Sequence, residues 1–412
     1  MRVAVIGAGI SGLAAAFYLS RKHDVWLIEK DGRIGGHTNT VSVETERGPL
    51  AIDTGFIVHN DRTYPNLVKL FDELGVEPMA SDMSFAVACQ QTGFEYSSRG
   101  FAGFFAQKTN LLRREHYRLL GEIVRFNREA PRWLDRTESL TLGEVMDEGR
   151  YAPVFTERYL YPMACAVWSM STDAIRSFPA STLLRFFDNH GMLGIATHPQ
   201  WKVLKGGSAT YLPLISKPFR DRILTRTTID RVTRSADGVT IAFRGRPAMD
   251  FDQVVFACHG NQILPLLEAP TDDERDVLGS FETSCNEVCL HTDGRVLARR
   301  PRARASWNYH LEREATAATL TYHMNRLQSL NVAEDYCVTM NGNSGIDPSK
   351  VIQRFIYHHP LYTRRAVAAQ SRWASISGQN RTHYCGAYWL YGFHEDGLNS
   401  AMRVARALGV AC

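Results

Sequence analysis

The sequence lacks the features that would identify a membrane-spanning or nucleic-acid-binding protein. It contains no run of about 18 uninterrupted apolar residues, so no transmembrane helix is expected. The formal net charge is only +4 and no nucleic-acid-binding motif occurs, which argues against a nucleic-acid partner. No internal repeat or low-complexity tract is visible. A chain of 412 residues with this composition predicts a folded protein of two or three domains.

The sequence is also without paired cysteines. Its eight cysteines are scattered and include no C-x-x-C pair, so we expect small buried hydrophobic side chains in a reducing cytoplasm. Without paired ligands no metal site is expected. Arg2 before an apolar run could be mistaken for a signal peptide, but the three glycines in residues 7–12 argue against that interpretation.

The first thirty residues contain a strand–turn–helix–strand pattern. Residues 1–6 predict a short buried strand, Gly7-Ala-Gly9-Ile-Ser-Gly12 follows, and a helical pattern then leads to a second apolar run that ends on Glu29. In dinucleotide-binding folds such glycines allow a tight turn, close approach to a pyrophosphate and close helix packing, and the terminal carboxylate binds ribose hydroxyls. The pattern therefore predicts dinucleotide binding. An ordinary β-α-β crossover with accidental glycines is the alternative.

The next segment indicates which dinucleotide. Lys30-Asp-Gly-Arg33-Ile-Gly35-Gly36-His37, followed by Asp53-Thr-Gly55, resembles the FAD-binding signature of the flavin amine oxidase superfamily. The resemblance implies FAD, with Arg33 and the glycine pair wrapping its pyrophosphate. Many members have Arg where this chain has His37, and a neutral imidazole supplies less fixed charge. Non-covalent binding is expected, because the S-G-G-C motif is absent and Cys385 precedes Gly386.

The same resemblance implies an α/β fold with two domains. The first is an FAD-binding Rossmann-like parallel-sheet domain, formed by residues 1–80, 200–270 and 376–412. The second is a discontinuous α+β substrate domain, formed by residues 81–199 and 271–375, with an antiparallel sheet and a helical insertion that covers the cofactor. Periodicity predicts hairpins over 85–96 and 223–243 and four alternating runs between 281 and 340. It predicts helices over 66–74, 111–128, 142–148, 151–161, 181–187 and 211–219.

Near the C-terminus, a strand ending at Gly386 and a glycine-rich helix start at Gly392 resemble another cofactor element of the superfamily. There a helix N-terminus stabilises negative charge on the reduced flavin. Ala387 stands where many members have an acidic residue or Thr. The residues expected to bind FAD are Gly7, Gly9, Ile10, Ser11, Gly12, Glu29, Lys30, Arg33, Gly35, Gly36, His37, Asp53, Thr54, Gly55, Gly206, Gly207, Val232, Ala257, Gly386, Ala387, Gly392, Phe393, Asp396 and Gly397.

Three side chains are candidate catalytic residues: His190, His359 and Tyr391. Imidazole titrates near neutral pH and can therefore exchange protons, although a structural role is the alternative for each histidine. Several aromatic residues near the last glycines allow three interpretations: a cage for an amine, an apolar wall for a lipid, or packing in the core. They are Tyr384, Tyr388, Trp389, Tyr391 and Phe393.

Two segments suggest contact with a membrane surface. Residues 98–108 mix aromatic and basic residues, and Arg113-Arg114 follow Leu111-Leu112, as in segments that enter a lipid headgroup layer. A core helix edge with solvated charges is the alternative. The basic run 295–304 is interpreted most simply as a solvated loop, or as an addition to an anionic-lipid surface. The expected location is cytoplasmic, with peripheral association at the inner face of the cytoplasmic membrane.

The whole chain also resembles a narrower group, through motifs such as Arg185-Phe-Phe-Asp-Asn-His-Gly191 and Ala305-Ser-Trp-Asn-Tyr309. These are bacterial FAD-dependent oxidoreductases associated with cyclopropane-fatty-acid-synthase-type methyltransferases and with methylated and furan fatty acid formation. The resemblance implies dehydrogenation (desaturation) of a methylated fatty acyl chain, free or in phospholipid, by hydride transfer to flavin N5, with a methyltransferase partner. The alternatives are an amine oxidase that produces hydrogen peroxide and a flavin-binding scaffold protein without turnover.

Overall fold

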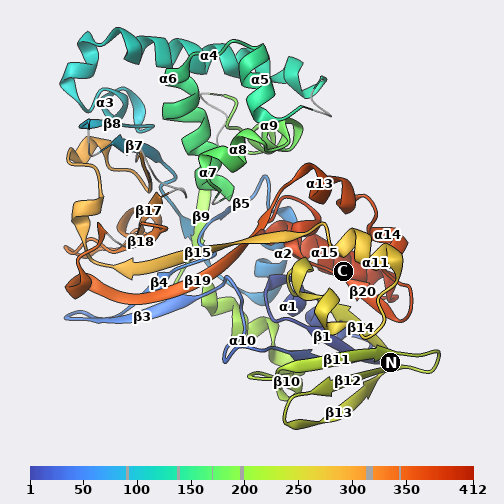
Figure 1. Ribbon diagram of the computed structural model, residues 1–412. Coiled ribbons are helices and arrows are strands. Elements are labelled where there is room, and N and C mark those ends of the chain that lie inside the picture. The colour runs from blue at the N-terminus through green and yellow to red at the C-terminus, as the bar shows by residue number, and fades with distance from the viewer. Residues whose placement is uncertain (90–91, 137–139, 169, 195–198, 312–318, 343–344) are drawn as a thin grey trace.

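Two large β-sheets of different character organise the chain (Figure 1). The computed structural model describes residues 1–89, 92–136, 140–168, 170–194, 199–311, 319–342 and 345–412. One sheet is parallel and carries the N-terminus, and the other is mainly antiparallel and carries the helical insertion. The predicted α/β fold is confirmed.

The parallel sheet has five strands in the order β10-β2-β1-β14-β20. Its central strands are almost entirely buried, as expected for a parallel sheet covered on both faces. The order places strands from the beginning, middle and end of the chain side by side. They are β1 (Arg2–Ile6), β2 (Asp24–Ile28), β10 (Ile223–Leu224), β14 (Gln253–Phe256) and β20 (Thr382–Tyr384).

Helices cover one face of the parallel sheet, and a small sheet with further helices covers the other. The first face holds α1 (Ile10–Leu19), α2 (Pro65–Leu74), α10 (Leu212–Ile215) and α15 (His394–Ala407). The second holds β11 (Ile229–Arg234), β12 (Val239–Phe243), β13 (Arg246–Phe251), α11 (Asp272–Leu278), α13 (Arg364–Gln370) and α14 (Trp373–Ile376). The predicted helix over 66–74 is confirmed. It ends at Gly75 because that residue adopts the left-handed conformation, φ 70°.

The second large sheet has seven strands in the order β19-β15-β18-β17-β16-β7-β8. Neighbours are antiparallel except for β16 and β7. The four predicted alternating runs and the 85–96 hairpin are confirmed, and residues 90–91 of that hairpin lie outside the described residues. The strands are β7 (Phe85–Cys89), β8 (Phe94–Ser97), β15 (Glu282–His291), β16 (Trp307–His310), β17 (Thr319–His323), β18 (Cys337–Met340) and β19 (Val351–Leu361).

The helical insertion packs on this second sheet and lies farthest from the parallel sheet in Figure 1. Leu119, Phe126 and Trp133 share one buried core with sheet residues Val87 and Tyr309. The helices are α3 (Gly100–Phe104), α4 (Arg114–Leu134), α5 (Leu142–Glu148), α6 (Pro153–Phe155), α7 (Tyr161–Trp168), α8 (Thr172–Arg176) and α9 (Ala180–Asn189). The predicted helices over 142–148 and 181–187 are therefore confirmed.

Short elements connect the two regions. The β3–β4 hairpin follows the N-terminal motif, β5, β6 and β9 form a small antiparallel sheet, and α12 follows β17. Their bounds are β3 (Thr40–Thr45), β4 (Gly48–Asp53), β5 (His59–Asn60), β6 (Pro78–Ala80), β9 (Trp201–Leu204) and α12 (Met324–Leu327).

Some predicted elements are wrong in extent. The helix over 211–219 shrinks to α10, because Pro218 lacks an N–H donor and disfavours helical geometry before it; Phe219 has φ −131°. The helix over 151–161 is divided into α6, a π-helical turn over Thr156–Leu160 and the start of α7. The helix over 111–128 begins only at Arg114.

The expectation of buried cysteines is wrong at two positions. Cys285 and Cys412 are exposed and Cys89 and Cys258 are partly buried, whereas Cys165, Cys289, Cys337 and Cys385 are buried. Cys285 lies on the part of β15 that pairs with β19 but extends beyond β18, and Cys412 is the last residue of the chain.

Candidate functional site

A cavity of about 1310 Å³ extends from the parallel sheet to the helical insertion. Four parallel strands end at this cavity, and a residue just after each of them lines it: Gly7 after β1, Glu29 after β2, Ala257 after β14 and Gly386 after β20. This is the edge at which parallel α/β sheets bind ligands. The volume exceeds the 300–1,000 Å³ typical of small-ligand pockets, so the cavity has room for a dinucleotide and a second molecule.

The cavity brings together most residues that the sequence predicts to bind FAD. Segments from the N-terminal turn, from the loop before β3, from the end of β14 and from the start of α15 meet there. The predicted residues that line it are Gly7, Gly9, Ile10, Ser11, Glu29, Lys30, Arg33, Gly36, His37, Gly55, Ala257, Gly386, Ala387, Gly392 and Phe393.

The other predicted cofactor residues do not line the cavity. They are Gly12, Gly35, Asp53, Thr54, Gly206, Gly207, Val232, Asp396 and Gly397. Asp53 instead links three segments, because its Oδ1 accepts hydrogen bonds from the Ser208 amide and hydroxyl and from the Thr40 hydroxyl. The Gly206–Gly207 turn packs against this arrangement. Asp396 accepts from the Phe393 amide at 2.9 Å and stabilises the start of α15.

The start of α1 fits an anionic ligand. Gly9 precedes the helix, no side chain caps its first turn, and a Cβ added at Gly9 would meet nothing within 4 Å. The unpaired N–H groups and the positive end of the helix dipole therefore open onto the cavity. Beside them, Glu29 accepts hydrogen bonds from the Ala8 and Asp31 amides, at 2.7 and 2.9 Å, which orients its carboxylate at the strand end. This geometry suits a pyrophosphate and its ribose.

A group of imidazoles, the histidine cluster, lines the cavity and consists of His37, His259, His358 and His359. The ring centroid of His37 lies 5.1 Å from that of His359 and 6.2 Å from that of His259. Burial lowers the pKa of both His37 and His259 to about 3, and repulsion by neighbouring imidazoles acts in the same direction. His37 is therefore neutral near pH 7. Its buried Nε2 has no protein partner among the described residues and can bond to a ligand.

The proton position on His359 follows from a chain of hydrogen bonds. The Glu287 amide donates to Asn341 Oδ1, so Asn341 Nδ2 donates to Asn286 Oδ1. Asn286 Nδ2 then faces Ser284 Oγ at 2.9 Å and His359 Nδ1 at 2.8 Å. His359 Nδ1 therefore accepts, and the neutral ring carries its proton on Nε2. Burial lowers the pKa of His359 to about 4, so the ring is a neutral donor at the cavity wall.

His190 has the opposite arrangement. Its Nδ1 lies 2.8 Å from the Phe186 carbonyl oxygen, which can only accept, so the neutral ring carries its proton on Nδ1. Burial lowers the pKa of His190 to about 4, and its ring stacks on Phe186 at 3.8 Å. Its Nε2 therefore holds a lone pair. Because His190 lines the cavity, it is a candidate proton acceptor.

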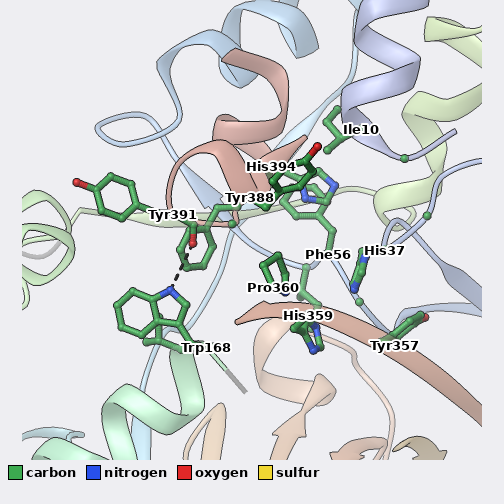
Figure 2. Close-up of a pocket in the computed structure, with 18 of the residues that line it drawn as sticks. Ile10, His37, Phe56, Trp168, Tyr357, His359, Pro360, Tyr388, Tyr391 and His394 are labelled. Carbon is green, nitrogen blue, oxygen red and sulfur yellow. Dashed lines mark hydrogen bonds between the residues drawn. The ribbon is translucent and has the colours of Figure 1, made fainter. Parts of the chain in front are cut away.

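The aromatic residues near the C-terminus separate into two groups. Tyr388, Tyr391 and Phe393 line the cavity, and Trp168 Nε1 donates to the Tyr391 carbonyl at 3.3 Å (Figure 2). Tyr384 and Trp389 do not line it and pack in the core. In Figure 2, Trp168 and Tyr391 lie to the left of Phe56, whereas His37 and Tyr357 lie to its right.

The end of the cavity nearest the helical insertion is mainly apolar, and Asn127 is a polar residue of its wall. Its walls include the side chains of Phe104, Leu120, Ile123, Tyr159 and Met163. Among the described lining residues, the only carboxylates are Glu29 and Asp31, which lie at the opposite, N-terminal end. This half of the cavity suits a long apolar group and offers no counter-ion for an ammonium group.

Several lining residues were not predicted. The rings of Phe56 and His394 stack with their centroids 3.6 Å apart, and the ring centroid of Tyr357 lies 5.1 Å from that of His37. His259 follows β14, so the rule that ligands bind beyond the carboxyl ends of parallel strands could have indicated it. Phe56 follows the Asp53-Thr-Gly55 motif directly. Tyr357 lies two residues before the predicted His359 on β19, and residues two apart on a strand share a face, so this spacing could have indicated it.

Within the described ranges, no group of three His, Cys, Asp or Glu side chains is arranged to hold a metal ion. In the same residues, no helix combines the length and apolar character needed to cross a bilayer.

Comparison with known proteins gives one family match and many similar structures. A family model described as flavin containing amine oxidoreductase matches residues 10–333. A CLA-producing fatty acid isomerase from P. acnes is similar over 99% of both chains, with a TM-score of 0.73 and 15% identity. Cyclohexylamine oxidase from Brevibacterium oxydans is similar over 99% of both chains, with a TM-score of 0.66 and 16% identity. At these identities the likeness shows a shared fold.

A shorter match comes from a plant protein. Protoporphyrinogen oxidase 2 from Arabidopsis thaliana is 42% identical over 76 residues, which is 18% of this chain. The matched segment spans only 14% of the length of that relative.

Proposed function

The chain belongs to the flavin containing amine oxidoreductase family, and from this premise we propose that it dehydrogenates a methylated fatty acyl chain, free or in phospholipid. It is an FAD-dependent oxidoreductase. The observation that carries the proposal is the apolar half of the cavity, which lies between Phe393 and Tyr391 at one end and the lining residues of α4 at the other. The similar fold of a protein named as a fatty acid isomerase is compatible with an acyl chain in this position.

The reaction removes two hydrogens from adjacent carbons. FAD, when bound, accepts one of them as a hydride. The other leaves as a proton, and His190 Nε2 in the cavity wall has a lone pair that can receive it. The walls around Tyr159 and Met163 exclude water from the acyl chain and hold it in one orientation.

The resemblance to methyltransferase-associated proteins supports the finer part of the proposal. On this basis the methyl group is added by a cyclopropane-fatty-acid-synthase-type methyltransferase before the oxidation. An amine substrate is disfavoured by the absence of a carboxylate in the described walls of the apolar half.

Anaerobic mixing tests the proposal directly. The FAD-loaded enzyme should lose its oxidised-flavin absorbance when mixed with a methylated monounsaturated phospholipid or fatty acid, and the product should be a diene. Reduction by small amines with peroxide release, but not by lipid, would support an amine oxidase instead. Reduction by neither would support a scaffold protein.

A variant of the cavity wall gives a sharper form of the same test. Met163→Trp places a larger side chain in the apolar half, so reduction by long acyl chains should slow by at least about tenfold, while short chains react normally. The matched control is Met79→Trp, because Met79 is only partly buried and does not line the cavity. Equal slowing by chains of every length would contradict the assignment of this half to the acyl chain.

A further inference from the structure

The surface over α3 and α4 carries a group of exposed apolar side chains, the α3–α4 patch, formed by Phe101, Leu111, Leu112, Tyr117, Leu120 and Val124. Phe101 is 73% exposed and Leu112 is 88% exposed. Most exposed large apolar side chains in the described part of the chain belong to this one patch. Such a concentration marks an interaction surface, whereas single exposed apolar residues are ordinary.

Contacts and helical spacing place members of the patch side by side. Phe101 packs on Phe105 with ring centroids 4.6 Å apart, and Phe105 lies 5.7 Å from Tyr117. The Tyr117 hydroxyl donates to the Leu111 carbonyl at 3.0 Å. Along α4, Tyr117, Leu120 and Val124 are spaced by three and four residues and face outward. The helix therefore has a second apolar stripe besides the one that packs in the core.

Basic side chains surround the patch. Residues 98–128 contain seven basic and two acidic residues, so this segment carries more positive charge than the whole chain, whose formal net charge is +4. Lys108, Arg113, Arg114 and Arg118 are exposed and have no ion-pair partner among the described residues. One of the two acids, Glu115, is paired with Arg158 at 3.3 Å.

The tertiary structure adds a second basic segment to the same surface. The 3₁₀ turn Pro301–Ala303 packs against α3 and β8. Ser97 Oγ donates to the Arg302 carbonyl at 2.8 Å, which fixes this turn beside the patch. The exposed side chains of Arg299 and Arg302 therefore add to the basic rim.

The patch lies at one end of the cavity. Leu120 lines the cavity and is 41% exposed, while its neighbours Tyr117 and Val124 on α4 are exposed without lining the cavity, so Leu120 stands at an opening. Phe104 of α3 and Ile123 and Asn127 of α4 line the cavity beside it. The apolar half of the cavity therefore reaches the surface within the α3–α4 patch.

We propose that the α3–α4 patch docks on an anionic phospholipid bilayer and that the acyl substrate enters the cavity past Leu120. The apolar residues enter the headgroup boundary while the surrounding Lys and Arg side chains bind lipid phosphates. An acyl chain then moves from the bilayer into the cavity without exposing its methylenes to water. The direction of entry rests on the proposed function, whereas the docking itself does not.

Charge complementarity favours a bilayer over a second copy of the chain. A two-fold dimer through this patch would bring two like-charged rims together, which is repulsive. An anionic surface instead meets the uncompensated cations with opposite charge.

Vesicle binding by the FAD-loaded protein tests the docking. Binding to phosphatidylcholine vesicles that contain phosphatidylglycerol should be strong at low salt and much weaker to phosphatidylcholine alone. Arg113→Gln together with Arg114→Gln should weaken binding about 25-fold, because each cation near an anionic surface contributes about fivefold. Phe101→Asp together with Leu112→Asp should abolish binding.

The matched control is Leu214→Asp together with Ile352→Asp, which changes exposed apolar residues on other faces and should leave binding unchanged. Wild-type binding by the Phe101→Asp, Leu112→Asp variant would overturn the inference. The inference would also be overturned if the wild-type protein did not bind vesicles and sedimentation velocity showed a wild-type dimer that this variant converts to a monomer.

A second measurement separates this inference from the proposed function. The Phe101→Asp, Leu112→Asp variant should be reduced at the wild-type rate by monomeric short-chain substrate and slowly by substrate in vesicles. If vesicle binding behaves as described but no acyl lipid reduces the flavin, the docking is supported and the proposed function fails.

Discussion

At the scale of single residues, two glycines of the N-terminal turn differ in what surrounds them. A Cβ added at Gly12 would lie 1.8 Å from the Gly7 carbonyl oxygen, so this position must be glycine for α1 to pack against the turn. A Cβ added at Gly9 would meet nothing within 4 Å, and its φ of −73° is accessible to alanine. The protein itself therefore tolerates alanine at Gly9, but the methyl group would occupy the expected pyrophosphate site.

Alanine substitutions should separate these two roles. Gly9→Ala should leave the melting temperature of the FAD-free protein unchanged and weaken FAD binding by at least about tenfold. Gly12→Ala should lower the free energy of unfolding by about 1–3 kcal/mol or more, because the packed turn must move. Gly121→Ala, on the open side of α4, is the control, and it should bind FAD normally and gain up to about 1 kcal/mol. Normal FAD affinity in Gly9→Ala would contradict the assignment of the turn.

At the scale of elements, strands β15 and β19 together set the proton position of a cavity residue. Asn286 belongs to β15 and His359 to β19, and the two residues occupy neighbouring positions in the antiparallel pair. Asn341, immediately after β18, orients Asn286 from the other side. The register of three strands therefore makes His359 a donor through Nε2.

Changing the polarity of Asn286 should reverse this arrangement. In Asn286→Asp, a carboxylate beside Nδ1 should move the proton to Nδ1 and raise the pKa of His359 by about 1–3 pH units. Histidine ¹⁵N NMR of the two proteins measures both quantities. Ser284→Ala removes the other acceptor of Asn286 without changing polarity and should leave His359 unaltered. A wild-type ring protonated on Nδ1 would show that the hydrogen-bond chain is assigned wrongly.

The helices also show where the sequence pattern and the observed bounds differ. The apolar spacing over 211–219 is compatible with a helix, but Pro218 interrupts it, so only Leu212–Ile215 is α-helical. By contrast, Thr141 and Glu144 form a capping box that starts α5 where the sequence predicts a helix. Local signals of this kind are reliable because they depend on residues three or four positions apart.

At the scale of the whole molecule, many buried histidines make stability depend on pH. Burial lowers the pKa of eight of them to about 3 or 4, from the usual value of 6.5. They are His37, His59, His190, His259, His291, His310, His359 and His383. Between pH 6.5 and 4 the unfolded chain binds more protons at these residues than the folded chain does. Their contribution to stability, up to about 3 kcal/mol each, is therefore lost as the pH falls.

Three buried acids act in the opposite direction. Burial raises the pKa of Asp53 to about 6, that of Asp396 to about 7 and that of Glu395 above its usual value, so their contribution to stability decreases as the pH rises above their usual values. Because the histidines outnumber these acids, the melting temperature should fall steeply from pH 6.5 to pH 4. Differential scanning calorimetry of the holoenzyme at several pH values measures this. His383→Gln should reduce the number of protons taken up on unfolding, which the pH dependence reports, by about one. A melting temperature that is constant or higher at pH 4 would contradict the prediction.

The sequence by itself determined the dinucleotide turn, which is encoded within the first thirty residues, and most strands and helices through their own periodicity. The α/β class followed from that turn together with the family resemblance. Only the tertiary structure decided that Phe56 stacks on His394, that Asn286 orients His359, and that the Gly206–Gly207 turn packs against Thr40 and Asp53 rather than lining the cavity. It also placed the basic turn near Arg302 beside α3. These contacts join residues far apart in the chain, and local propensity does not specify which distant side chains meet. The order and register of the strands do.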